Sequence, residues 1–377
     1  MKFISKEMNL KGKTILLRAD LDSNYVNKKI ISGGRIKQAA ETIKFLKKKG
    51  ARVVVIAHQG RPNRGNCTSF KSHAKFLSKY TKVKFVNDLF GKKVEKAIKN
   101  LKNGKVILLE NVRKYKEEYK LGKNKFVENL SNWCNIYVND AFSNSHRKHT
   151  SMVSFAKVMP NYSGPLLEKE IASLKRIHLK KTLFILGGAK PKDNLKLLSK
   201  GKILACGLFG QMCLITKGKN LGAQDKYLKK LVKDFNHVVK KIKPRLKNVI
   251  TPLDFGVKIH GKRKDLNLSE FPSKYEIFDI GPKTRKLFIK EIKKAKSIYM
   301  KGPVGDFSSK GFEKGTFEIL KAIAKNKGFS LIGGGHLSDA IEKSGVNKKK
   351  FSHVSLSGGA LLNYIAGEKL PGIEVLR

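Results

Sequence analysis

The sequence predicts an α/β protein with two doubly wound, parallel-sheet domains joined by a connecting helix. Its 377 residues exceed what one hydrophobic core usually supports, so two domains of roughly 150 to 200 residues are expected. Short apolar segments rich in β-branched residues alternate with segments of helical periodicity, which is the pattern of βαβ units. The same alternation returns after about residue 180, which indicates a second domain of the same class.

The individual elements follow from the same patterns. In the first half, an apolar i, i+3, i+4 spacing predicts a helix over residues 35–50. Strands are predicted there over residues 14–20, 51–58, 82–86, 105–110 and 136–142. In the second half, strands are predicted over residues 182–188, 202–207, 248–255, 297–303 and 329–335, with a helix over 337–345. Between the halves, residues 164–180 predict a connecting helix that begins with Gly164 and Pro165.

The net charge of +52 would by itself suggest nucleic acid or an acidic membrane as a partner. The lysines, however, are spread along the whole chain and fall on the polar sides of predicted amphipathic helices. We therefore expect solvated helix faces rather than one dedicated binding surface. Nonspecific nucleic-acid binding at low salt is still expected from such a charge.

Targeting signals and metal motifs are not apparent in the sequence. No apolar run of about 18 residues predicts a membrane span, and the N-terminus does not resemble a signal peptide, so a cytoplasmic protein is expected. The cysteines form no CxxC pair and have no zinc spacing, so we expect reduced, mostly buried thiols and no metal site. They are Cys67, Cys134, Cys206 and Cys213.

Arginine is used sparingly, at twelve positions, and several of these follow predicted strands. In open parallel sheets the carboxyl ends of the strands carry the ligand site. A planar guanidinium binds carboxylate or phosphate through two parallel hydrogen bonds, which an ammonium cannot reproduce. Arginines at several strand ends therefore favour an anionic substrate in the first half, although some could instead pair with internal carboxylates such as Asp20 or Glu110. The candidate residues there are Arg18, Asp20, Asp22, Arg35, His58, Gln59, Gly60, Arg61, Glu110, Arg113 and Arg147.

The second half offers glycine turns after its predicted strands. Glycine at a helix N-terminus exposes backbone N–H groups and the positive end of the helix dipole, which suits phosphate. Tight packing between strand and helix also requires glycine, but several such turns in one half favour a nucleotide site. Neither a P-loop nor a strong GxGxxG motif is present. The turns are GGAK at Gly187–Lys190, ACG at 205–207, GPVGDF at 302–307 and GGGH at Gly333–His336.

Over nearly its whole length the chain resembles the phosphoglycerate kinase family, specifically its archaeal-type branch. The resemblance lies in LLRADLDSN, SGGRIKQAAETI, AHQGRP, YVNDAF followed by HRKH, GPLLEKEI, LGGAKPKDN, DIGPKT, GPVGDF and GGGHLSDAIEK, in this order. It implies two Rossmann-like domains joined by a hinge, and reversible transfer of the acyl phosphate of 1,3-bisphosphoglycerate to ADP, giving 3-phosphoglycerate and ATP. It further implies direct in-line transfer after domain closure, Mg²⁺ bound through the nucleotide phosphates, and a monomer.

The resemblance also implies a domain organisation. The 3-phosphoglycerate domain would span residues 1–163 and the nucleotide domain residues 181–351, on either side of a connecting helix over 164–180. Residues 352–377 would return to the N-terminal domain.

The resemblance assigns roles to particular residues. Asp20 would hold the hydroxyl region of the glycerate, Arg35 would neutralise the transferring phosphoryl group, and Lys190 would meet that group from the nucleotide side. His58, Arg61, Arg113 and Arg147 would bind the anionic groups of the substrate, and Leu21, Asp22, Gln59 and Gly60 would complete this site. The catalytic set is Arg35, Lys190 and Gly335. The nucleotide site would comprise Gly187, Lys190, Gly207, Gly302, Pro303, Ser308, Gly333, Gly334, Gly335 and His336.

Several positions depart from the family pattern, mostly on the nucleotide side. Asp22 and Lys301 stand where the family usually has Asn, and Asn194 replaces a second lysine. Ser308 stands where the family usually has a Glu that contacts the nucleotide ribose. The sequence therefore leaves undecided whether this chain makes that contact. His336 replaces an Asp associated with the metal nucleotide and is not expected to bind Mg²⁺, which prefers oxygen ligands. Leu337 and Ser357 also differ from the usual pattern. An alternative function is therefore a weakly catalytic relative that binds nucleic acid.

Overall fold

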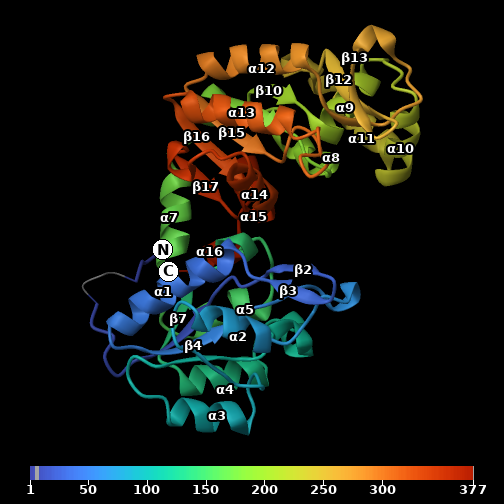
Figure 1. Ribbon diagram of the computed structural model, residues 1–377. Coiled ribbons are helices and arrows are strands. Elements are labelled where there is room, and N and C mark those ends of the chain that lie inside the picture. The colour runs from blue at the N-terminus through green and yellow to red at the C-terminus, as the bar shows by residue number, and fades with distance from the viewer. Residues whose placement is uncertain (5–7, 377) are drawn as a thin grey trace. The chain divides into compact units, whose positions relative to one another are not determined.

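The computed structural model describes residues 1–4 and 8–376, and these form two compact units (Figure 1). Unit 1 comprises Met1–Ala172 together with Glu368–Arg377, and unit 2 comprises Ser173–Gly367. Each unit contains its own six-stranded parallel sheet. The predicted fold class, two parallel-sheet α/β domains, is therefore confirmed.

The sheet of unit 1 has the strand order β5-β6-β4-β1-β7-β8. Every residue of the central strand β1 is buried, because helices cover both faces of a doubly wound sheet. Helix α1 packs Ile36, Ile43 and Leu46 into the same core as Ile15 and Val53 of the strands. The strands are β1 (Thr14–Arg18), β4 (Arg52–Ile56), β5 (Lys84–Phe85), β6 (Val106–Leu108), β7 (Ile136–Asn139) and β8 (Asn161–Ser163). The helices are α1 (Gly34–Lys48), α2 (Lys71–Ser78), α3 (Lys92–Lys99), α4 (Lys125–Trp133), α5 (Thr150–Val153), α6 (Phe155–Val158), α7 (Pro165–Leu174) and α16 (Pro371–Glu374).

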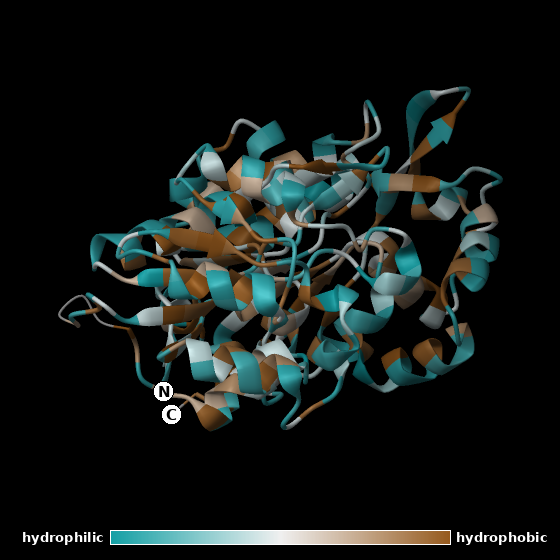
Figure 2. Cartoon of the chain, turned by 90° about the horizontal axis from the view of Figure 1, so that it is seen from below, coloured by the Kyte–Doolittle hydropathy of each residue, from teal (hydrophilic) through white to brown (hydrophobic). Residues whose placement is uncertain are grey.

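The parallel sheet of unit 2 has the order β11-β10-β9-β15-β16-β17. Its strands are β9 (Thr182–Leu186), β10 (Lys202–Ala205), β11 (Val249–Ile250), β15 (Ser297–Lys301), β16 (Phe329–Gly333) and β17 (His353–Ser355). The helices of this unit are α8 (Pro191–Asn194), α9 (Gly207–Thr216), α10 (Ala223–Leu231), α11 (Phe235–Ile242), α12 (Pro282–Lys294), α13 (Lys314–Lys325), α14 (Gly335–Lys343) and α15 (Gly359–Ala366). Helix α12 buries Phe288 and Ile292 and ends with Lys293 and Lys294. Figure 2 shows the same mixture of polar and apolar residues on most helices, as expected for lysine-rich helices with one solvated face.

Two antiparallel pieces were not predicted. The strands β12 (Asp254–Ile259), β13 (Lys262–Asn267) and β14 (Ile277–Ile280) form a separate sheet in unit 2, and β2 (Asn24–Val26) pairs with β3 (Lys29–Ile31) in unit 1. The single strand expected over residues 248–255 is therefore wrong. The chain leaves the parallel sheet after β11 and enters the antiparallel sheet at Asp254, with Pro252 between them.

The chain between and after the two sheets also differs in its details. The helix expected over 164–180 is helical over Pro165–Leu174, and a 3-10 turn follows at Leu179–Lys181. At the end of the chain, Asn139 Nδ2 donates to the carbonyl of Gly372 at 2.8 Å, within unit 1. Residues 352–367, which we expected to belong to the returning segment, group with unit 2 because β17 pairs with β16. None of the described helices is both long enough and apolar enough to cross a membrane.

The two units share a way of starting a helix. Asp140, directly after β7, accepts hydrogen bonds from the amides of Leu166 and Leu167 at the start of α7, at 2.8 and 3.1 Å. In unit 2, Asp254 accepts hydrogen bonds from the amides of Lys283 and Thr284 at the start of α12, both at 2.8 Å. Each buried carboxylate thus satisfies helix amides that have no partner within the helix.

Candidate active site

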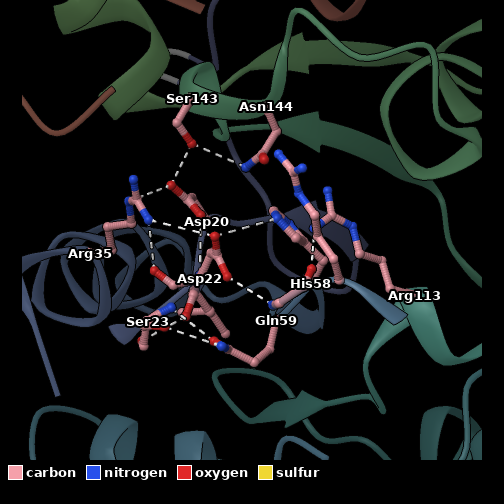
Figure 3. A network of polar contacts seen from close by, with 12 residues as sticks. Asp20, Asp22, Ser23, Arg35, His58, Gln59, Arg113, Ser143 and Asn144 are labelled. Carbon is pink, nitrogen blue, oxygen red and sulfur yellow. Dashed lines mark hydrogen bonds and ion pairs between the residues drawn. The ribbon is translucent and has the colours of Figure 1, made fainter. Parts of the chain in front are cut away.

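In unit 1, the candidate substrate residues follow neighbouring parallel strands, so they meet at the carboxyl edge of one sheet (Figure 3). The loop after β1 contributes Asp20 and Asp22, and the first turn of α1 contributes Arg35. The loops after β4, β6 and β7 contribute the other side chains. We call the group of four arginines and one histidine the basic site; its members are Arg35, His58, Arg61, Arg113 and Arg147.

Arg35 is oriented by the two aspartates of the loop after β1. Its Nε lies 3.0 Å from Asp20 Oδ2, and its Nη1 donates to the main-chain carbonyl of Asp22 at 2.8 Å. The same Asp20 oxygen accepts a hydrogen bond from the Ser143 hydroxyl. The pairing of an arginine with Asp20, which the sequence left open, therefore occurs. Because the Arg35 side chain remains 29% exposed, a ligand can still reach the oriented guanidinium.

Asp22 places a carboxylate among these cationic groups. Its Oδ1 accepts a hydrogen bond from the amide of Gly60 at 2.9 Å. Its Oδ2 lies 3.9 Å from both Arg35 Nη1 and His58 Nε2. Burial raises the pKa of Asp22, and the hydrogen bond from Gly60 opposes that shift. The ionised form of Asp22 is therefore less favourable than that of an exposed aspartate. It lies where an anionic substrate is expected to bind.

His58 is a buried, neutral imidazole that donates from Nε2. Arg18 Nη2 lies 3.1 Å from His58 Nδ1, and a guanidinium can only donate, so Nδ1 accepts and the ring proton resides on Nε2. Burial, followed by the charges of Arg18 and Arg113, holds the pKa of His58 well below its usual range. The Nε2–H group therefore offers the site a hydrogen-bond donor that does not titrate near neutral pH.

Arg113 and Arg147 are brought together despite their like charges. Burial, followed by the charges of Arg147 and Arg18, lowers the pKa of Arg113 to about 10. The pKa of Arg147 is also lowered, first by burial and then by the charge of Arg61. Among the described residues, no hydrogen-bond partner is found for the buried Nε of Arg147. Clustered guanidinium groups with an unsatisfied donor can bind an anion, which would relieve their repulsion and satisfy the donor.

Leu21, Gln59 and Gly60, which the sequence also placed in the substrate site, hold the surrounding loops in position. The Leu21 side chain lies in the hydrophobic core. Gln59 Oε1 accepts from the Ser23 amide at 2.8 Å, and Gln59 Nε2 donates to the Ser23 carbonyl at 3.1 Å. A Cβ atom on Gly60 would overlap the backbone of Asn66. These contacts connect the loops that follow β1 and β4.

Two further features of the site were missed or misplaced by the sequence analysis. Ser143 and its neighbour Asn144 complete the surroundings of Asp20, and they follow β7 in the segment that supplied Arg147, so the strand-end rule could have found them. Arg18 is one of the arginines that could, from the sequence, have paired with an internal carboxylate. It instead donates to the Ser151 hydroxyl at 2.9 Å, and this hydroxyl donates to buried Glu118 at 2.7 Å.

In unit 2, most of the predicted glycines pack turns against one another. We call Gly187, Gly188, Gly207 and Gly302 the glycine junction. The amides of Gly187, Gly188 and Gly207 donate to the carbonyls of Lys301, Pro303 and Val304. A Cβ atom on Gly187 would meet the carbonyl of Pro303, and one on Gly302 would meet Gly187. The glycine junction therefore needs glycine for close packing, and three of its amides are already used by the protein.

The turn at Gly333–Gly335 has a different environment at its end. A Cβ atom on Gly333 would meet Leu361, and the Gly334 amide donates to the Ser355 carbonyl at 3.0 Å. Gly334 adopts φ +113, and Gly335 begins α14. No described atom lies within 4 Å of a Cβ built on Gly334 or Gly335. The first amides of an α-helix have no partner within the helix, and they carry the positive end of its dipole. Of the predicted nucleotide residues, this turn and exposed His336 therefore offer an open helix start, as an anion site requires.

The remaining predicted nucleotide residues lie in exposed or partly exposed positions of unit 2. Lys190 is exposed and directly precedes α8, while Pro303 and exposed Ser308 belong to the loop after β15. The Ser308 amide donates to Asp306 at 3.0 Å. No group of three or more His, Cys, Asp or Glu side chains suited to a metal ion occurs within residues 1–4 and 8–376.

One parallel α/β unit with a basic side-chain site, and a second with an open helix start at its strand ends, together define a two-domain phosphotransferase. Comparisons with known proteins agree. A sequence model of phosphoglycerate kinase matches residues 5–368. The phosphoglycerate kinase of Pyrococcus furiosus is 38% identical over all of this chain and 97% of its own length. That of Archaeoglobus fulgidus is 37% identical over 97% of this chain and 94% of its own length.

Solved structures give the same result for the fold. A phosphoglycerate kinase from Pyrococcus horikoshii matches with a TM-score of 0.92 and 35% identity, covering 100% of this chain and 98% of that one. One from Coxiella burnetii matches with a TM-score of 0.80 and 28% identity over 98% of this chain and 97% of that one. The chain belongs to the phosphoglycerate kinase family. Nothing in these comparisons supports the nucleic-acid-binding alternative.

Proposed function

We propose that this chain transfers the acyl phosphate of 1,3-bisphosphoglycerate reversibly to ADP, with the glycerate substrate bound in unit 1 and the nucleotide in unit 2. The observation that carries the proposal is the gathering of Arg113 and Arg147 in the basic site, where the buried Nε of Arg147 has no described partner. Besides burial, the charge of Arg147 lowers the pKa of Arg113, and the charge of Arg61 lowers the pKa of Arg147. A small substrate with two anionic groups would compensate these charges.

Within this proposal, the residues around Asp20 position the substrate. Asp20 accepts a hydrogen bond from the glycerate hydroxyl. Its carboxylate is already held in position by Arg35 and Ser143. His58 donates from Nε2 to an anionic oxygen. The phosphate that is not transferred is bound by Arg61, Arg113 and Arg147. These three arginines form the part of the basic site with the largest excess of positive charge.

Arg35 is the residue of unit 1 that meets the transferring phosphoryl group. In the forward reaction, a β-phosphate oxygen of ADP forms a bond to phosphorus while the bond to the acyl oxygen breaks, leaving the carboxylate of 3-phosphoglycerate. The protein contributes positioning and charge neutralisation rather than a covalent nucleophile. The salt bridge to Asp20 fixes the plane of the Arg35 guanidinium before the phosphoryl group arrives. Direct transfer requires the two substrates to be brought together, so closure of the chain is part of the proposal.

In unit 2, we assign the nucleotide phosphates to the open helix start at Gly333–Gly335 and to Lys190. Gly187, Gly207, Gly302 and Pro303 then shape the floor of the site, and Ser308 and His336 lie at its exposed margin. Mg²⁺ would arrive with the nucleotide, because its phosphates supply oxygen ligands that the described side chains do not gather. The metal would offset phosphate charge during transfer. The proposal also takes the enzyme to be monomeric and cytoplasmic.

A coupled assay of ATP-dependent phosphorylation of 3-phosphoglycerate tests the function, and calorimetric titrations test each binding site. We expect turnover that depends on Mg²⁺, and binding of 3-phosphoglycerate that weakens in Arg113→Ala and Arg147→Ala without a change in ADP binding. Absence of turnover with millimolar Mg-ATP and 3-phosphoglycerate in the folded parent chain would overturn the proposal. Light scattering of the purified chain tests the monomeric state.

A further inference from the structure

Lys301 occupies a central position that neither the predicted nor the proposed site uses. It is the last residue of β15, and in the parallel register it is opposite Leu186 of β9 on one side and Gly333 of β16 on the other. β9 leads into the segment that carries Lys190, and β16 leads into the open start of α14. The backbone of Lys301 therefore lies between the two elements assigned to the nucleotide phosphates.

The Lys301 side chain is held at this edge of the sheet by the neighbouring helix α8. Its Nζ donates to Asn194 Oδ1 at 2.9 Å, and only 13% of the side chain is exposed. Asn194 is fully buried, and its Nδ2 donates to the carbonyl of Gly187 at 3.2 Å. Asn194 thus fixes the ammonium group of Lys301 to the turn that follows β9.

The charge of Lys301 is poorly compensated where it lies. The nearest described carboxylate oxygen, on Asp193, is 3.7 Å from Nζ, and the Asp193 side chain is 45% exposed. Burial lowers the pKa of Lys301, and the charge of Lys190 adds to this effect against the opposing charge of Asp193. By contrast, Lys202, at the opposite end of the strands in the same sheet, lies 2.6 Å from Glu291. A largely buried ammonium that is paired only with a more distant, partly exposed carboxylate such as Asp193 gains from a further anion that binds to it.

We propose that Lys301 is a second phosphate-binding lysine, which contacts the diphosphate group of the nucleotide together with Lys190 and is positioned for this by Asn194. The inference rests on the proposed function, since it takes a nucleoside diphosphate to be the ligand of unit 2. An ammonium carries three donors, so the bond to Asn194 leaves donors for phosphate oxygens. The proposed contact favours a nucleotide over a nucleoside, because Lys301 binds the phosphates and not the base.

The first experiment removes the charge and compares two lysines of one sheet. ADP, adenosine and 3-phosphoglycerate are titrated calorimetrically into the parent chain, Lys301→Met and the control Lys202→Met. We expect Lys301→Met to bind ADP about tenfold or more weakly, as for the loss of a hydrogen bond to a charged group. Binding of adenosine and 3-phosphoglycerate should not change, and Lys202→Met should bind all three ligands like the parent.

Two further variants separate the charge from the fold. Lys301→Gln keeps a donor for Asn194 Oδ1 but loses the charge, so it should retain the melting temperature of the parent and still bind ADP weakly. The double variant Asn194→Lys with Lys301→Asn exchanges the two side chains across their 2.9 Å contact and keeps one ammonium at the site. We expect it to recover ADP affinity to within about threefold of the parent, because most of a charge-assisted contact is restored.

The outcomes are distinguishable. Parent-like ADP affinity and a parent-like KM for ATP in folded Lys301→Met or Lys301→Gln would overturn the role of Lys301 alone. Equal weakening of adenosine and ADP would also overturn it, since that pattern indicates a structural role. A folded parent chain that binds no ADP would overturn the proposed function and this inference with it.

Discussion

Unit 1 and unit 2 both gather polar groups at the carboxyl edge of a six-stranded parallel sheet, but they use different parts of the chain to do so. In unit 1 the groups are side chains, such as the guanidinium of Arg35 and the imidazole of His58, each held by hydrogen bonds or ion pairs. In unit 2 they are largely backbone, with an open helix start at Gly335. Side chains can be matched to the shape of one small anion, whereas backbone amides accept any phosphate of suitable size.

The two units differ in their ligand-binding groups, but they stabilise the start of a helix in the same way. Asp140 in unit 1 and Asp254 in unit 2 both cap a helix that begins with a Gly-Pro pair. A Cβ atom on Gly164 or Gly281 would overlap the capping carboxylate. The comparison therefore predicts that substitutions in unit 1 affect activity through side-chain geometry, and that those of the glycines in unit 2 affect it through backbone packing or access.

The largest effect is expected from Arg35→Lys, which keeps the charge in unit 1 and removes the planar fork. Arg35 reaches Asp20 and the Asp22 carbonyl from two separate nitrogens of a planar group, and the single nitrogen of a lysine cannot reproduce this geometry, so we expect kcat to fall by about 100-fold or more. Circular dichroism and the melting temperature should match the parent. Arg52→Lys is the control, because Arg52 begins β4 at the opposite end of the strands and is bonded to Gly12. Parent-like kcat in Arg35→Lys would mean that charge alone suffices in unit 1.

A large effect of another kind is expected from Gly302→Ala in the glycine junction of unit 2. Gly302 has φ +74, and a Cβ atom there would meet the backbone of Gly187 and Gly188. We expect unit 2 to lose more than about 2 kcal/mol of stability, measured by denaturant unfolding. Gly311→Ala is the matched control, since Gly311 has φ +88 but open space around its Cβ position. Equal losses of stability in the two variants would mean that the positive φ, and not close packing, causes the loss.

Gly335→Ala tests the open helix start of unit 2 at a smaller scale. The added methyl group enters open space, so the fold should be retained, and we expect the methyl group to hinder the approach of a phosphate to the first turn of α14. We expect the KM for ATP to rise by about tenfold with an unchanged KM for 3-phosphoglycerate, as for the loss of one or two hydrogen bonds to a charged ligand. A rise in both KM values would show that the effect is not local to unit 2.

The same comparison explains which parts of the molecule could be predicted from sequence. The periodicity of the chain predicted both parallel sheets. The strand-end rule predicted that Asp20, His58, Arg113 and Arg147 lie at one edge of the first sheet, because parallel topology fixes where residues after the strands lie. The antiparallel sheet β13-β12-β14 was missed, since Asp254 and the residues after it continue an apolar run that also suits a parallel strand.

Glycine could not be interpreted from sequence in the same way. Gly207 and Gly335 both follow predicted strands and begin helices, but the amide of Gly207 donates to Val304 whereas Gly335 lies in open space. Whether a glycine packs against another turn or faces a ligand depends on contacts between segments far apart in the chain. The link from Arg18 through Ser151 to Glu118 was unpredictable for the same reason.

The smallest effect is expected from Asp22→Asn, which tests whether unit 1 is tuned by charge as well as by shape. Asparagine can still accept from the Gly60 amide through its carbonyl oxygen, and it removes the negative charge that lies 3.9 Å from Arg35 and His58. We expect 3-phosphoglycerate to bind about three- to tenfold more tightly, because one repulsion between partly buried charges is lost.

The pH dependence supplies the sharper test of Asp22. Burial raises the pKa of its carboxyl above the usual value, so the fraction that is protonated, and hence uncharged, increases as the pH falls toward that raised pKa. Binding of 3-phosphoglycerate to the parent should therefore strengthen relative to Asp22→Asn as the pH is lowered from neutral toward the raised pKa of Asp22. Protonation of the ligand itself affects both proteins equally and cancels in the ratio. A ratio of affinities that does not change with pH would mean that Asp22 stays ionised throughout this range, and equal affinities at every pH would mean that its charge has no effect on binding.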